Sequence, residues 1–125
     1  MNILPLIGAT LILLLVGVHS YLGERYILIR LFRRADLPHL FGSDIFTKRT
    51  LRFAWHLTSV AWLGLAVLFM IIAGPPDALG RGQVGAVLAA TAAVSAVVTL
   101  VGSWGRHLAW IVFLVVAVAA WLGSR

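Results

Sequence analysis

Apolar residues form four long runs along the chain, at about residues 3–22, 51–73, 84–101 and 108–122. A helix needs about 20 mainly apolar residues to cross the hydrocarbon core of a bilayer. The first three runs meet or approach this length, whereas the fourth is short and is expected to begin at the membrane interface. The pattern therefore predicts an all-α membrane protein with four transmembrane helices.

Turn-forming residues separate these runs. Glycine and proline dominate residues 74–77, glycine flanks the arginine of residues 80–82, and two further glycines occur in residues 102–106. Such clusters are strong loop signals, and short connections make consecutive helices antiparallel. The chain is therefore predicted to form one domain, residues 1–125, built as an antiparallel four-helix bundle.

The polar stretch between the first two runs, residues 25–50, is not expected to be irregular throughout. Residues 26–34 have the composition of a helix, Pro38 disfavours its continuation, and Ser43 or Asp44 is placed to cap a new helix. Two arrangements fit this pattern. Either the first two helices extend past the bilayer as a long hairpin, or their flanks lie on the lipid headgroups.

The composition supports a membrane location. Hydrophobic residues make up 62% of the chain and charged residues 11%, whereas soluble domains contain about 45–50% and about 25%. There is no cysteine, which excludes disulfides and thiolate metal sites. The N-terminus has no basic region before the first apolar run, so we expect this run to be retained as a span.

The basic residues are distributed unevenly between the two ends of the predicted spans. One end has only Arg81 and Arg125. The other end has eight: Arg25, Arg30, Arg33, Arg34, Lys48, Arg49, Arg52 and Arg106. Basic loops face the cytoplasm, which predicts a protein of the bacterial cytoplasmic membrane with both termini outside. The expected partner of this charge is the lipid bilayer and not nucleic acid.

Three of the four histidines fall at this basic end: His19, His56 and His107. Ionisable side chains at membrane depth are costly, so they mark candidate functional sites. If the first hairpin turns near residues 37–39, antiparallel pairing places His19 opposite His56. We therefore predict that the three imidazoles meet in one layer of the bundle, while His39 in the loop is solvated.

Polar neighbours accompany these histidines. Ser20 and Glu24 are four residues apart, so they share a helix face, as do His56 and Ser59 at a spacing of three. Arg52, one turn before His56, should keep its imidazole neutral, which is the metal-binding form. The residues expected to surround and support the site are Ser20, Ser59, Arg52 and Arg106.

Glu24 has several candidate roles. It lies five residues after His19, or about 140° around a regular helix, so the two do not share a face. Glu24 becomes a fourth metal ligand if the helix bends at Gly23, or it orients an imidazole by accepting its N–H. The simpler alternative is a salt bridge to Arg25 or to Arg52, which antiparallel pairing places opposite Glu24.

Several functions fit this set of residues. Three imidazoles with water or Glu24 suit Zn²⁺ or a similar divalent metal, and we favour a metal-binding site, catalytic if the metal activates water. The alternatives are a b-type haem held by His19 and His56, a proton or ion path in an oligomeric transporter or channel subunit, and a structural accessory subunit. No established motif such as HExxH is present.

The third run contains two rows of small residues at four-residue spacing. Such rows let helices approach closely in lipid. They predict packing inside the bundle or, alternatively, a homo-oligomer interface. The rows are Gly82, Ala86 and Ala90, and Gly85, Ala89 and Ala93.

Overall fold

The computed structural model describes residues 3–75 and 80–125, and in these ranges the regular structure is helical. The predicted turn at Pro76 and Asp77 therefore lies outside the described residues. The helices are α1 (Ile3–Leu22), the π-helical turn η1 (Gly23–Leu28), α2 (Ile29–Leu31), α3 (Ile45–Ile72), α4 (Arg81–Ser103) and α5 (Ala109–Gly123). The all-α prediction is confirmed for the described part of the chain.

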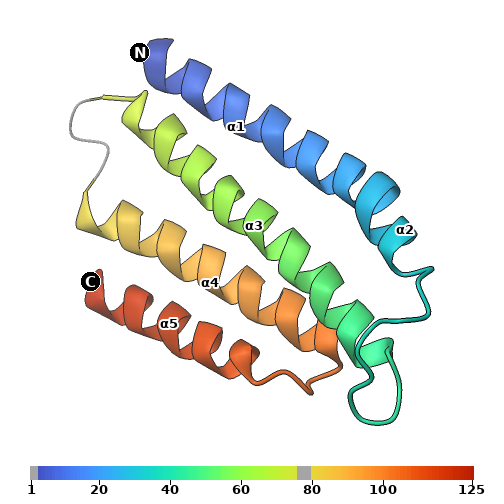
Figure 1. Cartoon of the computed structure of the whole chain (residues 1–125). Helices are drawn as coiled ribbons and strands as arrows, with labels where there is room; N and C mark the ends of the chain where they lie inside the picture. The colour runs from blue at the N-terminus through green and yellow to red at the C-terminus, as the bar shows by residue number, and fades with distance from the viewer. Residues whose placement is uncertain (1–2, 76–79) are drawn as a thin grey trace.

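The four long helices lie side by side in one layer, in chain order (Figure 1). Helix α1 packs on α3, α3 on α4 and α4 on α5, and each runs opposite to its neighbour. Among the described residues α1 touches neither α4 nor α5. The helices therefore form an open layer and not the closed bundle that we expected.

All four long helices of this layer carry exposed apolar side chains. Leu11 on α1, Leu63 on α3, Val97 on α4 and Val115 on α5 are all exposed. In water these side chains would drive the layer to close, whereas lipid tails are as apolar as leucine and supply no such force. Exposed apolar side chains of this kind are therefore less costly in an apolar surrounding than in water.

In the described part of the chain, three helical segments are long and apolar enough to cross a membrane: Ile3–Leu31, Ile45–Ile72 and Arg81–Ser103. The fourth, α5, has 15 residues and rises about 22 Å, which is shorter than the roughly 30 Å hydrocarbon core. The sequence predicted that this fourth apolar segment is short.

The first two helices extend beyond the predicted spans. The first helix continues through η1 and α2 to Leu31, in line with α1 (Figure 1), and α3 begins at Ile45 instead of near residue 51. The helical character predicted for residues 26–34 is thus confirmed up to Leu31. This arrangement favours the long-hairpin alternative.

Ion pairs organise the loop that joins these helices. Arg34 donates to Asp36, and this hydrogen bond lowers the pKa of the Asp36 carboxyl to about 2. Asp44 occupies the cap position before α3, as predicted, but its side chain makes no cap hydrogen bond. It pairs instead with Lys48 at 2.6 Å, and this hydrogen bond lowers the pKa of Asp44.

Helices α4 and α5 pack through small side chains. A Cβ atom added to Gly85 would overlap Ser124 and approach the carbonyl of Ala120. Gly85 and Ala89 are buried, so part of the predicted small-residue rows serves packing within one chain. A homo-oligomer through the rest of these rows stays a prediction.

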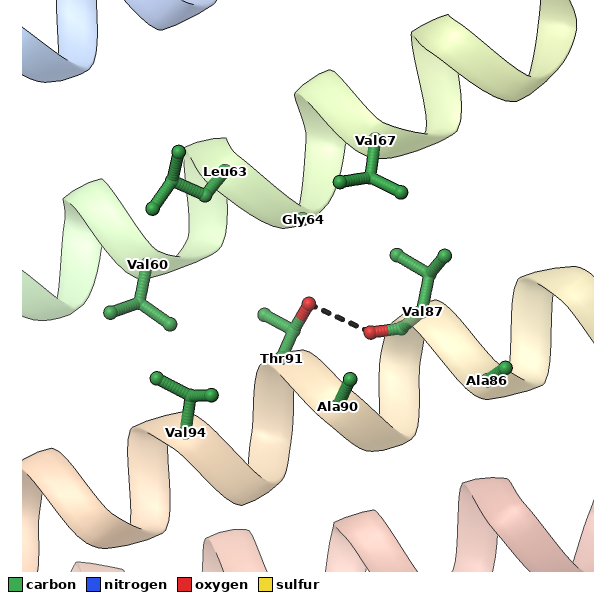
Figure 2. A pocket seen from close by; sticks show the side chains of 9 residues that line it. All are labelled: Val60, Leu63, Gly64, Val67, Ala86, Val87, Ala90, Thr91 and Val94. Carbon is green, nitrogen blue, oxygen red and sulfur yellow. Dashed lines mark hydrogen bonds between the residues drawn. The ribbon is translucent and has the colours of Figure 1, made fainter.

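Helix α4 also approaches α3 closely. A Cβ atom on Gly64 of α3 would overlap the Thr91 side chain of α4. Figure 2 shows Thr91 beside Gly64, with its hydroxyl donating to the Val87 carbonyl at 2.8 Å. An apolar groove of about 400 Å³ lies here, and Ala86 and Ala90 line it from α4.

The Gly85 contact can be tested with a glycine one turn away. Gly85→Ala should lower stability by about 1–3 kcal/mol, because the new methyl group overpacks against α5. Gly82→Ala is the matched control, since its Cβ would have no neighbour closer than Ser124 O at 4.0 Å. Thermal unfolding of the purified protein in detergent measures both variants. Equal midpoints would contradict the packing of α4 on α5.

Candidate functional site

The π-helical turn η1 begins at Gly23, directly against a side chain of α3. The indole of Trp55 occupies the place of a side chain, because a Cβ atom on Gly23 would overlap it. Trp55 Nε1 donates to the carbonyl of His19 at 3.2 Å. A side chain inserted into the helical hydrogen-bond ladder distorts it, and π-helical turns are frequent at functional sites. The contact explains why the helix widens here.

His19 is held by α3 through ring and hydrogen-bond contacts. Its imidazole stacks on Trp55 at 4.5 Å between ring centroids and lies edge-on to Trp62 at 4.9 Å. Its Nε2 lies 2.9 Å from Thr58 Oγ1. The same nitrogen lies 3.3 Å from Trp55 O, and the Thr58 hydroxyl is 2.7 Å from that carbonyl. His19 Nε2 thus has polar partners on α3.

A second group of polar residues lies beside it, and we call it the His56 cluster: Ser20, Glu24, Arg52, His56 and Ser59. His56 Nε2 is 3.5 Å from Glu24 Oε2, and His56 Nδ1 is 3.3 Å from Ser20 Oγ. Ser20 Oγ is also 2.7 Å from Ser59 Oγ. Arg52 binds both oxygens of Glu24, at 2.8 and 3.2 Å. The five side chains thus form one continuous polar series.

The His56 cluster leads from an exposed to a buried position. The Arg52 side chain is 50% exposed, those of Glu24 and His56 are 31% and 34% exposed, and Ser59 is 6% exposed. From Arg52 to Ser59 the series advances seven residues along α3, which is about 10 Å. It therefore connects the basic end of the helices with their interior.

His107 lies apart from these two groups. Its ring packs edge-on against Phe53 at 5.4 Å, and its Nδ1 accepts the N–H of Ala109 at 3.3 Å. Arg106, expected to support the site, lies over the Phe41 ring at 6.0 Å instead. Both residues belong to the turn before α5, which the open layer separates from α1.

The predicted metal ligands are only partly brought together. Glu24 and His56 are adjacent, whereas His19 and His107 have other partners. Within residues 3–75 and 80–125 no group of three or more candidate ligand side chains is placed to hold a metal. Zinc sites use at least three protein ligands, so these residues do not fit the expected zinc site. The two histidines of the haem alternative have separate partners: His19 lies against Thr58 and Trp55, and His56 lies against Ser20 and Glu24.

No protein-family model, curated protein or solved structure matches this chain. A functional assignment therefore depends on the chemistry of the His56 cluster.

Arg49 connects α3 to the end of α4, a role that the sequence did not predict. Arg49 donates to the carbonyls of Val101 and Gly102 at 2.7 and 2.6 Å, and its guanidinium lies 3.7 Å from the centre of the Trp104 ring. It thereby satisfies the last carbonyls of α4, where a cation is favourable. The sequence showed only that Arg49 is charged. It could not show the contact with α4, because the partners of Arg49 lie about fifty residues away in the chain.

Substitution of Gly23 tests the contact on which the site is built. Gly23→Ala should displace Trp55 and lower stability by about 1–3 kcal/mol, since overpacking forces neighbouring groups to shift. Gly17→Ala on the same helix has no atom within 4 Å of the new Cβ and should leave stability unchanged or raise it by up to about 1 kcal/mol. Thermal unfolding in detergent compares them. A Gly23→Ala variant as stable as Gly17→Ala would show that Trp55 is not seated as described.

Proposed function

We propose that this chain is an integral protein of the bacterial cytoplasmic membrane that moves protons through the His56 cluster, as a subunit of a transporter or channel. The observation that carries the proposal is the polar series from Arg52 to Ser59. Of the functions that the sequence allowed, a proton path is the one that needs only neighbouring donors and acceptors.

The arginines support the membrane placement. The 20 residues of α1 rise about 30 Å, which matches the hydrocarbon core. Arg25 and Arg30 follow, and the π-helical turn brings both guanidiniums against the Tyr26 ring, at 5.8 and 5.4 Å. Tyrosine and arginine are typical of the membrane interface. The excess of basic residues at this end favours a cytoplasmic loop, with both termini outside.

The His56 cluster has the groups that a proton relay requires. An imidazole can accept a proton on one nitrogen and release one from the other, and histidine is the side chain whose charge ordinarily changes near neutral pH. A proton taken up by Glu24 passes to His56 Nε2, and the Nδ1 proton leaves toward Ser20 Oγ. The hydroxyls of Ser20 and Ser59 each accept one proton and donate another. Arg52 fixes the Glu24 carboxylate at the entrance.

A path across the whole membrane needs more than one copy of the layer. The described helices enclose no lumen, because α1 and α5 do not meet. Further polar groups, supplied by a second layer, would have to continue the series beyond Ser59. The proposed transporter or channel is therefore an oligomer.

Proton flux into proteoliposomes tests the relay. Under a potassium diffusion potential, His56→Ala should slow internal acidification on the order of 10²-fold, because it removes the central proton carrier. Glu24→Gln should slow it as well, since an amide does not bind and release the proton. A trapped pH-sensitive dye reports the rate.

His107→Ala is the matched control, because His107 lies in the turn before α5 and should leave the flux unchanged. Metal analysis of the same untagged preparations separates the proton path from the zinc site that the sequence suggested. Stoichiometric zinc that disappears in both His56→Ala and His107→Ala would overturn the proposal. Identical flux in all variants would do so too.

A further inference from the structure

A cavity of about 400 Å³ lies between α3 and α4 at the basic end of the layer. Arg49, Arg52 and His56 line it from α3, and Val97 and Val101 line it from α4. Its size falls within the range of small-molecule sites, about 300–1,000 Å³. The cavity is therefore large enough for a ligand and has one charged and one apolar part.

The charged part has an excess of positive charge. Arg52 is paired with Glu24, whereas no carboxylate among the described residues lies within ion-pair distance of Arg49. The carbonyls of α4 that Arg49 binds supply only about half a negative charge. The guanidiniums of Arg49 and Arg52, together with the Glu24 carboxylate, thus leave one net positive formal charge in this cavity. Arg49 has neutral partners, the two carbonyls and the Trp104 ring, but no anionic one, which makes the cavity suited to a single anion.

The guanidiniums also have donors to spare. Arg49 uses Nε and Nη2 for the carbonyls of Val101 and Gly102, and Arg52 uses the same two nitrogens for Glu24. The Nη1 groups of both arginines have no acceptor among the described residues. Carboxylates and phosphates are the anions that such N–H groups bind in a fixed geometry, through two acceptor oxygens.

The apolar part continues inward from the arginines. Val101 and Val97 are one turn apart on α4 and are 63% and 59% exposed. The direction from Val101 to Val97 leads away from the basic end, as does the direction from Arg49 to His56 on the antiparallel α3. In the proposed membrane placement the charged part lies at the headgroup level and the valines lie among the acyl chains.

We propose that this cavity binds a long-chain carboxylate, a fatty-acid-like monoanion with its head at Arg49 and Arg52 and its chain along Val97 and Val101. The inference rests on the proposed membrane placement, and it names a ligand class for the site that contains His56. The bound carboxylate lies beside the proton relay, because His56 both lines the cavity and belongs to the relay. A fatty acid is a substrate whose charge depends on a proton, which makes this pairing chemically consistent.

Equilibrium binding of radiolabelled laurate to the full-length protein in nonionic detergent tests the inference. Wild type should bind one laurate saturably, and Val97→Trp, which fills the apolar part, should weaken binding by tenfold or more. Val94→Trp is the matched control, because Val94 is an exposed valine on the same helix that does not line this cavity. It should bind as wild type does.

Competition identifies the ligand chemistry. Unlabelled laurate should displace the label, whereas acetate, which lacks the chain, and dodecanol, which lacks the charge, should not. Displacement by dodecanol as strong as by laurate would overturn the proposal, as would unaltered binding to Val97→Trp. Stronger displacement by dodecyl phosphate would overturn the carboxylate assignment in favour of a phosphate headgroup.

The binding assay uses no pH gradient, so it is independent of the relay. If flux proves insensitive to His56→Ala while laurate binds as expected, the proton path fails and the ligand site stands. If flux depends on His56 but laurate does not bind, the ligand site fails and the proton path stands.

Discussion

The position of Trp55 against the backbone of Gly23 determines how α1 and α3 fit together. Only glycine leaves room for the indole, and the Nε1–H of the same ring bonds to the His19 carbonyl. This contact fixes the rotation of α1 about its axis as well as its position along α3. That rotation directs Ser20 and Glu24 toward His56, so every distance in the His56 cluster depends on it.

A second constraint is the medium in which the layer lies. Among the described residues, each long helix contacts only the long helices next to it in the chain. Side chains such as Leu11 and Val97 remain exposed on the surface of the layer. Close contacts at Gly64 and Gly85 provide the cohesion between helices. Van der Waals packing of this kind is what associates helices in lipid, where hydrophobic burial gives no advantage. The fold and the proposed location therefore support each other.

The sequence predicted the helices and most of the first hairpin's pairing, because apolar runs and turn residues are local signals. The expected pairing of His19 with His56 was close, since His19 meets Trp55 and Ser20 meets His56. One residue of difference is 100° of helix rotation, and the contact that sets it lies between distant segments. The place of His107 required knowing that α3 and α4 lie between α1 and α5 in an open layer, which no periodicity encodes.

The short α5 forms one edge of this layer, with 15 residues beside the 23 of α4. In the proposed placement, lipids along that edge must shorten by several ångströms or the edge must tilt, and either response costs a fraction of a kcal/mol per ångström. The total cost of this difference between helix length and bilayer thickness falls when two such edges share one thinned patch of bilayer. The elastic energy of the membrane itself thus favours bringing copies together through α5, without any specific contact between them.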